Sequence, residues 1–585
     1  MTVNDATVSL ATAVITHCFC KSFRTSNGFR TITAELRSTH RNCHPTSANT
    51  DVFGPDPQAS TDSTSVLKNM QITVKIPALA SEPLKTRQQQ SRNMSRLLQP
   101  VFLMTITYLY CFVAESPGQA FEPKQRPNIV LIFIDDMGWK DTGANGSDLY
   151  ETPNIDALAA DGLTFTNAYA AAGNCEPSRA CLISGQYTPR HHMYAVGSTN
   201  RGPHQKMRVL PIPNINSLPQ ENYTIANAMS EAGYATGMFG KWHLGKQTPH
   251  LPVDQGFQSV DTMNPPSAKI FEQTADPKNI SRITNGACDF MEHHRDEPFF
   301  VYIAHHATHM GIQAAPATMA KFSSKGPGKQ HQNTAFAAMN ADMDKSVGRV
   351  LQKIKSLGIE DNTIIFFTSD NGGLPQSPQT PLRGFKGMYY EGGIRVPMFV
   401  RWPGKIPAGS TSHTPVINID LYPTFLELAS AARSDDKALD GESLVGLVTA
   451  ATPLKRKSIF WHFPGYLDRA NPGARDNEFR TRPVTVIRKG DWKLHLFHEE
   501  WSLDGGLNKV ATNQSVELYD LSNDIGEHEN LAGTASEKRD ELISDLLSWS
   551  QKVDAKFAQE PNPKYGTPTN EKRKRKRKRQ GTTNP

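Results

Sequence analysis

The stretch NIVLIFIDDMG, residues 128–138, joins a continuous apolar run to two adjacent carboxylates. Residues 128–134 carry no alternation of polar and apolar side chains, which is typical of a strand buried on both faces in a parallel sheet. Asp135 and Asp136 follow at once, and a glycine comes two residues later. We therefore predict a buried strand over 128–134 that delivers two carboxylates to one edge of a sheet.

The same design recurs along the chain. Apolar strands are predicted at 235–239, 298–304 and 363–368, and helical segments at 152–162, 224–233 and 333–357. This alternation predicts an α/β domain with a large, mainly parallel sheet flanked by helices. The carboxyl ends of parallel strands meet at one edge, where ligands bind. The groups that follow the three later strands should therefore lie near Asp135: Lys241, His243, His309, Asp370 and Asn371.

A cysteine lies at the start of another predicted helix, in GNCEPSRACLISGQ, residues 173–186. Pro177 suits the first helical position and Gly185 suits the helix end. Cys175 would then lie at the N-terminal mouth, where free N–H groups and the helix dipole favour negative charge. Arg179 adds a fixed positive charge one turn later. A buried structural cysteine is the ordinary alternative.

The residues after the first and last of these strands suggest a metal site. Asp135, Asp136, Asp370 and Asn371 offer only oxygen ligands, the set that Ca²⁺ or Mg²⁺ prefers over zinc. Acidic and amide residues also occur as ordinary turn residues after strands. Their recurrence at two strand ends, each with a glycine within the next two residues, favours the metal, with Ca²⁺ first and Mg²⁺ as the alternative.

Cationic groups accompany this site. Lys241, His243 and His309 follow strands, and Lys386 lies in the glycine-rich stretch PLRGFKGMYYEGGIRVP, residues 381–397. Any one of them alone is more often a surface or core residue. Around one metal and one helix mouth, together they indicate a tetrahedral dianion or a monoester as the ligand.

Charge and cysteine content bound the remaining possibilities. Eight consecutive Lys/Arg residues at 572–579 exceed the formal net charge of +6, so the rest of the chain is acidic on balance. A basic run of this kind is usually a solvated tail, and we expect no nucleic-acid partner. Only three of the seven cysteines lie beyond residue 120. This number does not suggest a disulfide scaffold and leaves Cys175 free for another role.

Residues 94–120 have the pattern of an export signal. Met94 and Arg96 precede an apolar run over 97–113, and Gly118 and Ala120 provide a cleavage site. A single N-terminal anchor is the alternative. We predict a secreted or periplasmic protein without a stable membrane span. Residues 1–93 are expected to be disordered or to lie upstream of a true start at Met94.

The pattern of predicted strands and helices changes near residue 455. Segments 483–497 and 516–524 predict strands of a smaller antiparallel sheet, and 537–552 predicts a terminal helix. We therefore expect a catalytic domain over 121–450, an α+β subdomain over 451–560, and a disordered basic tail over 561–585.

These motifs resemble those of the sulfatase family. CEPSRACLISG resembles its Cys-x-Pro-Ser-Arg signature, and DDMG, GKWHLG, DNGG and YEGGIRVP match further blocks in the family's order. IRKGDWKL and LYDLSNDIGEHENLA resemble its C-terminal region, so the resemblance covers about residues 126–535. It implies an alkaline phosphatase-like fold and the hydrolysis of sulfate monoesters of aryl alcohols or carbohydrates.

The resemblance also implies a set of roles. A separate maturation enzyme would convert Cys175 to formylglycine, whose hydrate provides the attacking hydroxyl. The implied metal ligands are Asp135, Asp136, Asp370, Asn371 and the modified Cys175. Arg179 and Lys241 would hold the diol, and Lys241, His309 and Lys386 would bind sulfate. His309 with Lys386 would protonate the leaving alcohol, and His243 would remove the proton that triggers sulfate release. His306 is the alternative to His309.

Two other functions remain open at this point. A phosphatase or phosphodiesterase of the same superfold would use similar metal and anion chemistry, although it needs Ser or Thr as nucleophile. A secreted polyanion-binding protein could keep the fold without turnover, and the basic tail could attach it to sulfated polysaccharide.

Residues 196–222 and 258–282 are candidate substrate-facing loops.

Overall fold

The computed structural model describes residues 126–262, 271–434 and 436–568. The predicted export signal at 94–120, the segment 1–93 and the basic run at 572–579 lie outside these ranges. Within them, none of the helices combines the length and apolar character needed to cross a lipid bilayer.

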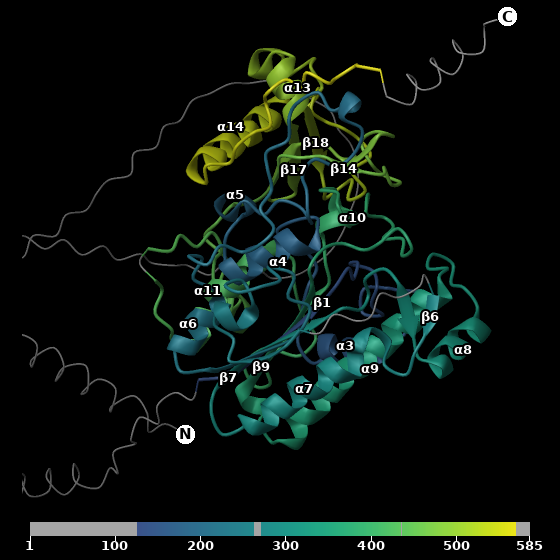
Figure 1. Cartoon of the computed structure of the whole chain (residues 1–585), viewed down its shortest axis with the longest axis vertical. Coiled ribbons are helices and arrows are strands. Elements are labelled where there is room, and N and C mark those ends of the chain that lie inside the picture. The colour runs from purple at the N-terminus through teal and green to yellow at the C-terminus, as the bar shows by residue number, and fades with distance from the viewer. Residues whose placement is uncertain (1–125, 263–270, 435, 569–585) are drawn as a thin grey trace, which may run out of the picture. The chain divides into compact units, whose positions relative to one another are not determined.

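An eight-stranded sheet forms the centre of the described part (Figure 1), as the sequence predicted. Its order is β11-β2-β10-β9-β1-β7-β4-β5. The five strands from β9 to β5 are parallel: β9 (Thr363–Ser369), β1 (Asn128–Ile134), β7 (Phe299–His305), β4 (Ala235–Gly240) and β5 (Ser259–Asp261). On the other side, β10 (Met398–Arg401) is antiparallel to β9 and to β2 (Leu163–Phe165), and β11 (Ser410–Ser412) is parallel to β2.

The register places the ends of three central strands at the same level. Ile134, the last residue of β1, pairs with His305 of β7 and with Ser369 of β9. The residues that follow each strand therefore leave the sheet side by side. Asp370 N–H also donates to Ile134 O (3.1 Å), and Asp135 N–H to Ala307 O (3.1 Å).

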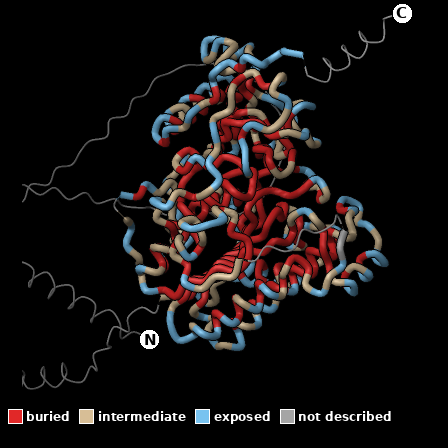
Figure 2. Tube along the Cα trace, in the orientation of Figure 1, coloured by how far each residue is buried: buried red, intermediate tan, exposed pale blue. Residues whose placement is uncertain are grey.

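Helices cover both faces of this sheet (Figure 1). On one face lie α3 (Pro153–Ala160), α7 (Ile280–His293) and α9 (Thr334–Ser356); on the other lie α4 (Cys175–Ser184), α6 (Ile225–Glu231) and α11 (Leu421–Ala429). Alternate residues of β1 pack into the two separate cores, with Ile132 in the first and Leu131 in the second. Burial on both faces explains why this strand is a continuous apolar run (Figure 2).

The smaller antiparallel sheet is confirmed, with the order β13-β16-β17-β18. Its strands are β13 (Ser458–Phe463), β16 (Val484–Lys489), β17 (Trp492–Phe497) and β18 (Val516–Asp520). Helix α14 (Ser536–Lys552) packs Leu542 and Leu546 against Leu494 and Leu496 of this sheet.

The shorter helices are α5 (Thr188–His191), α8 (Pro316–Lys325), α10 (Glu391–Ile394), α12 (Val445–Ala450) and α13 (His498–Leu503). The shorter strands are β3 (Ala168–Tyr169), β6 (Phe271–Gln273), β8 (Ile312–Ala314), β12 (Val416–Ile417), β14 (Leu467–Asp468) and β15 (Phe479–Thr481).

A fully buried ionic cluster connects this smaller sheet to the segment that follows Lys386. Lys493 of β17 donates from Nζ to Glu391 Oε1 and to Glu527 Oε1, both at 2.9 Å. Glu391 is the first residue of α10, and its N–H donates to Glu527 Oε2 (2.6 Å). Three charged side chains from distant parts of the sequence are thus paired away from water.

Three sequence predictions differ in detail from the structure. Helix α4 begins at Cys175, so Pro177 is its third residue and not its first. The first four N–H groups of a helix have no partner within it, and proline is therefore tolerated there as well. The helix predicted over 152–162 is shorter, because α3 begins at Pro153, after Thr152, whose hydroxyl donates to the Asp156 side chain (2.9 Å), and ends at Ala160. Strand β7 continues to His305, which is fully buried and bonded to Ser346 Oγ (2.8 Å).

Candidate functional site

The carboxyl edge of the sheet brings the four predicted oxygen ligands together. Asp135 and Asp136 follow β1, while Asp370 and Asn371 follow β9, and all four are buried. The N–H of Asp136 donates to Asp370 Oδ1 (3.0 Å), and Asn371 Nδ2 donates to Asp136 Oδ1 (2.9 Å). Asp136 adopts a left-handed backbone with φ of 65°, a conformation that aspartate tolerates better than most residues. These bonds turn the side chains from two neighbouring strands toward one point.

Cys175 reaches the same point from the N-terminus of α4. Its Sγ and one carboxylate oxygen each of Asp135 and Asp370 lie within 4.8 Å of one another. The thiol is only 2% exposed, and all three cysteines of the described ranges are free. The helix mouth and the two strand ends therefore meet in one place.

Arg179 connects Asp370 with the backbone that follows β4. Its side chain is fully buried, with Nε and Nη2 both donating to Asp370 Oδ2 (2.9 and 2.7 Å). Nη1 donates to the carbonyl oxygen of Lys241 (2.9 Å) and to the Tyr302 hydroxyl (3.3 Å). One arginine thus connects α4 with the residues that follow β9 and β4. Because the guanidinium is a rigid planar fork, it fixes the orientation of the Asp370 carboxylate.

The donor set fits a hard divalent cation. Asp135 Oδ1 and Asn371 Oδ1 are buried, and neither has a hydrogen-bond partner among the described residues. An unsatisfied oxygen in a buried site is costly, and a bound cation removes that cost. Three carboxylates and one amide supply the oxygen ligands that Ca²⁺ and Mg²⁺ take. The residues present therefore suit the predicted metal.

Cationic groups surround these oxygens. Lys241 Nζ donates to Asp135 Oδ2 (2.7 Å), and Lys386 Nζ donates to Asp136 Oδ2 (2.7 Å). His309 Nε2 lies 3.8 Å from Asp136 Oδ2. The Nε2 atom of His243 lies 3.7 Å from Glu176 Oε2, and its Nδ1 is buried without a partner in the part of the chain that the structure describes. All four predicted cationic or proton-transferring groups reach the edge where the carboxylates lie.

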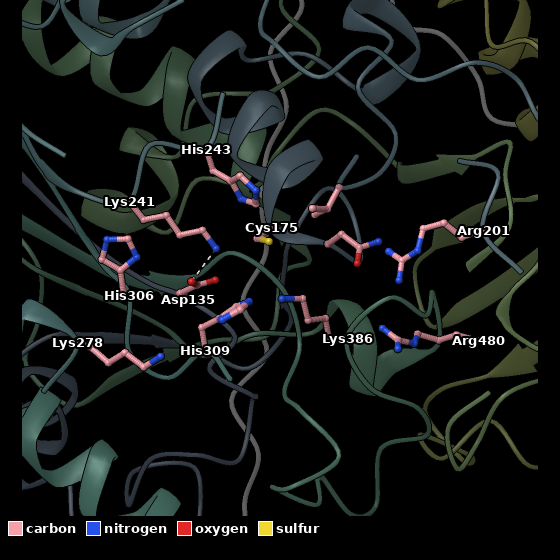
Figure 3. A pocket seen from close by; sticks show the side chains of 12 residues that line it. Asp135, Cys175, Arg201, Lys241, His243, Lys278, His306, His309, Lys386 and Arg480 are labelled. Atoms are coloured by element: carbon pink, nitrogen blue, oxygen red, sulfur yellow. Dashed lines mark hydrogen bonds and ion pairs between the residues drawn. The ribbon is translucent and has the colours of Figure 1, made fainter. Parts of the chain in front are cut away.

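Figure 3 shows that the four cationic or proton-transferring groups line one pocket together with Asp135 and Cys175, and the volume of this pocket is about 510 Å³. His306 and His309 both contribute to it, so the pocket alone does not choose between them. Three cationic residues that the sequence did not single out also line it: Arg201, Lys278 and Arg480. Lys278 is buried and donates from Nζ to Met310 O (2.9 Å), with no carboxylate of the described residues paired to it. The excess of positive charge suits an anionic ligand.

No local signal in the sequence identifies these three residues individually, although Lys278 falls within the predicted substrate-facing segment 258–282. Lys278 lies in a short 3-10 turn (Pro277–Asn279) and has a left-handed φ of 54°. Arg201 lies in a long loop, although within the predicted substrate-facing segment 196–222, and Arg480 lies in a three-residue strand. Only their tertiary neighbours bring them to the pocket.

Burial and charge together set the protonation states in the pocket. Burial raises the pKa of the Cys175 thiol despite the nearby lysines, so the thiol is protonated at neutral pH. Burial, followed by the charge of Lys241, lowers the pKa of His243 to about 2, which leaves its imidazole neutral. Burial alone would raise the pKa of Asp135, but Lys241 and its other cationic neighbours hold it well below its usual range. The pocket thus offers a neutral imidazole and an ionised carboxylate close to a thiol that is not activated.

Comparison with known proteins places this geometry in a family. Residues 127–431 match the family model described as "Sulfatase", and residues 385–552 match "N-sulphoglucosamine sulphohydrolase, C-terminal". A sulfatase of Formosa agariphila is 32% identical over 494 residues, covering 70% of this chain and 85% of that protein. Human arylsulfatase A is 33% identical over 473 residues, covering 72% of this chain and 86% of that protein.

A solved structure agrees with these matches. Ps i-CgsB in complex with k-i-k-neocarrahexaose has a TM-score of 0.57 and 27% sequence identity, covering 78% of this chain and 98% of that chain. The family models together span both sheets and every residue of the pocket. The chain belongs to the sulfatase family of sulfuric ester hydrolases.

Proposed function

We propose that this protein hydrolyses sulfate monoesters of sugars or aryl alcohols with a formylglycine derived from Cys175 and a divalent cation, Ca²⁺ before Mg²⁺. The observation that supports this most directly is the convergence of Cys175 Sγ with Asp135 and Asp370 within 4.8 Å. The raised pKa of the thiol argues against a thiolate nucleophile and favours a converted side chain. The relatives include an arylsulfatase and a protein solved with a bound neocarrahexaose, which supports both substrate classes.

The two groups that the chain does not itself encode have distinct tasks. The hydrated aldehyde at position 175 supplies the hydroxyl nucleophile, and the cation stabilises negative charge on the oxygens around it. We propose that Asp135, Asp136, Asp370 and Asn371 hold the cation together with residue 175. Their buried and partly unsatisfied oxygens support this assignment.

The cationic side chains bind and orient the ester. Lys241, Lys386 and His309 contact the carboxylates from the pocket side, where their N–H groups can also donate to sulfate oxygens. Arg179 and Lys241 would hold the hydroxyl groups at position 175, because Arg179 lies one turn after Cys175 in α4 and donates to the carbonyl oxygen of Lys241, which lines the pocket with Cys175. Positive charge placed in advance around the developing oxyanion lowers the barrier without reorganisation during the reaction.

Two sites of proton transfer are needed on either side of position 175. His309, supported by Lys386, donates a proton to the oxygen of the leaving alcohol as the ester S–O bond breaks. His243 accepts a proton from a hydroxyl at position 175, so that sulfate is released and the residue is restored. Its neutral imidazole and unpartnered Nδ1 suit that task. Overall, one water is consumed, and the products are an alcohol and sulfate.

Intact-mass measurement of the peptide that contains Cys175 tests the proposal directly. Because the thiol is 2% exposed in the folded protein, the maturation enzyme should be co-expressed so that it acts during synthesis. We expect the thiol to be replaced by an aldehyde or its hydrate, and the same preparation to release sulfate from 4-nitrophenyl sulfate. Cys175→Ala, expressed in the same way, should fold and release none.

The alternatives predict different results in the same experiment. A phosphatase of this superfold would favour 4-nitrophenyl phosphate over 4-nitrophenyl sulfate. A polyanion-binding protein without turnover would keep an unmodified Cys175 and hydrolyse neither ester. An unmodified cysteine in a preparation that still hydrolyses sulfate esters would refute the formylglycine route while leaving the sulfatase activity intact.

We further propose that the protein is exported, which the predicted signal at 94–120 supports. N-terminal sequencing of the mature protein should find a first residue near Phe121. A mature protein that retains residues 94–120 would favour the anchor instead.

A further inference from the structure

Arg480 in β15 is the one arginine among the pocket-lining residues without a counter-ion in the described parts of the chain. Its Nε is buried without a hydrogen-bond partner, and no carboxylate pairs with its guanidinium. Its neighbours in the same region are all paired: Arg475 with Glu500, and Arg482 with both Asp476 and Glu499. The side chain of Arg480 is half-buried, and a buried N–H donor left without a partner is costly, so its retention at the pocket points to a ligand.

The backbone beside Lys386 positions this arginine. A Cβ built on Gly387 would lie 2.6 Å from Arg480 Cδ and 3.3 Å from its Nη1, so the arginine lies across a residue that has no side chain. The hydroxyl of Thr481, the next residue in β15, donates to the carbonyl oxygen of Gly387. Arg480 is thereby held directly beside the lysine proposed to bind sulfate, as Figure 3 also shows.

Arg201 lies near Arg480, on the same side of the pocket (Figure 3). Its N–H donates to Tyr466 O (3.2 Å), and its guanidinium pairs with Asp468 of β14 (2.8 Å). Burial, followed by the charge of Arg201, lowers the pKa of Arg480, so each guanidinium lies within the field of the other. Asp468 pairs with Arg201 and not with Arg480. The two arginines and this one carboxylate therefore leave a net positive charge on this side of the pocket.

We propose that Arg480, together with Arg201, binds a second anionic group on the substrate, so that the preferred substrate is a saccharide with a further sulfate or a carboxylate near the ester that is cleaved. This inference rests on the proposed sulfatase function and defines its substrate class. A guanidinium with no internal partner presents its N–H fork to two oxygens of one sulfate or carboxylate. Figure 3 shows Lys386 between Arg480 and Cys175. Because Lys386 is proposed to support protonation of the leaving alcohol, the second anion would lie on that side of the ester.

Matched pairs of saccharides test this substrate class. The first two pairs are glucosamine 6-sulfate with glucosamine N,6-disulfate, and N-acetylgalactosamine 6-sulfate with its 4,6-disulfate. A third pair adds a neighbouring hexuronate to N-acetylgalactosamine 6-sulfate, which separates a carboxylate from a sulfate as the second anion. We expect kcat/KM for release of the 6-sulfate to rise about 10-fold or more in the doubly anionic member of at least one pair. One charge-assisted hydrogen-bonded contact contributes a factor of about this size.

Variants assign that preference to the arginine. Arg480→Gln should bring the ratio of kcat/KM within the preferred pair close to one, mainly through KM, and Arg480→Lys should leave an intermediate ratio. Arg469→Gln is the matched control, because Arg469 is 85% exposed, lies beside Asp468 and does not line the pocket. That control should keep the wild-type ratio. Thermal unfolding of each variant checks that the fold is retained.

The outcomes separate this inference from the proposed function. Hydrolysis of 4-nitrophenyl sulfate and the monosulfated sugars without any preference for a second anion would overturn the substrate class alone. The substrate class would also be overturned if Arg480→Gln kept the preference, or if Arg469→Gln lost it equally. Failure to hydrolyse any sulfate ester after confirmed conversion of Cys175 would overturn both.

Discussion

Replacing Lys493 by methionine should lower the free energy of unfolding by about 3–5 kcal/mol, because one partner of a buried ionic group is removed. Lys493 is fully buried and bonds to both Glu391 and Glu527 at 2.9 Å. Methionine fills a similar volume but leaves both carboxylates without this cation. Glu391 keeps Arg395 (3.1 Å) and the Tyr169 hydroxyl (2.7 Å).

Most of the cost should therefore fall on Glu527. Burial already raises its pKa to about 7, with Lys493 opposing that rise. Without the lysine the pKa of Glu527 rises further, so the folded variant binds a proton that the unfolded chain releases above about pH 4.3. Stability then falls as pH rises through this window. The loss should consequently be larger at pH 8 than at pH 6.

Urea unfolding of both proteins at pH 6 and pH 8 measures this difference, provided that the m values agree. Lys489→Met is the matched control, since Lys489 lies in the same sheet but pairs with Glu541 and Asp545 while 31% exposed. It should cost less than about 1 kcal/mol. The double variant Lys493→Met/Glu527→Gln should recover more than half of the loss. A loss below about 1 kcal/mol for Lys493→Met at pH 8, equal to that of the surface control, would refute this account of the cluster.

Three further predictions concern the site. His309→Ala should lower kcat by about 100-fold or more, as expected for a lost general acid, while His306→Ala should have a smaller effect; the reverse order would transfer the role to His306. Removing divalent ions with a chelator should abolish sulfate release, and adding back Ca²⁺ or Mg²⁺ at about 100 times its Kd should restore it and raise stability by about 2.7 kcal/mol; activity that survives complete chelation would contradict the metal. Gly387→Ala should destabilise the fold by about 1–3 kcal/mol, because its φ of 89° and the contact with Arg480 both oppose a Cβ; an unchanged melting temperature would show that the loop adapts freely.

Local sequence patterns were sufficient to predict the sheet and the convergence of the four oxygen-bearing side chains at its edge. A continuous apolar run such as 128–134 can be satisfied only by burial on both faces, and the polar residues that follow it must then leave at a sheet edge. Asp135 and Asp370 could therefore be placed together before their strands were known to be adjacent. Their pairing follows from the register of β1 with β9.

Other features depend on contacts that no local pattern encodes. Pro177 could not fix the start of α4, which is Cys175, because proline is accepted anywhere in the first helical turn. Arg480 reaches the pocket through the pairing of β14 with β15, and Lys278 through a left-handed residue in a single turn. Neither segment is long enough to show a hydrophobic period. The structure was needed to reveal the charge that surrounds the predicted centre.

Both backbone polar groups of Gly387 are hydrogen-bonded to other segments of the chain. Its N–H donates to Gly173 O (2.6 Å), two residues before Cys175, and its carbonyl oxygen accepts from Thr481 in the strand that carries Arg480. A swap of the β14–β15 hairpin between sulfatases, intended to change selectivity, would therefore also shift the reaction centre. Grafting is expected to succeed only when Gly387 and Thr481 are transferred together with the hairpin. Substrate selectivity and the geometry of the reaction centre would therefore change together.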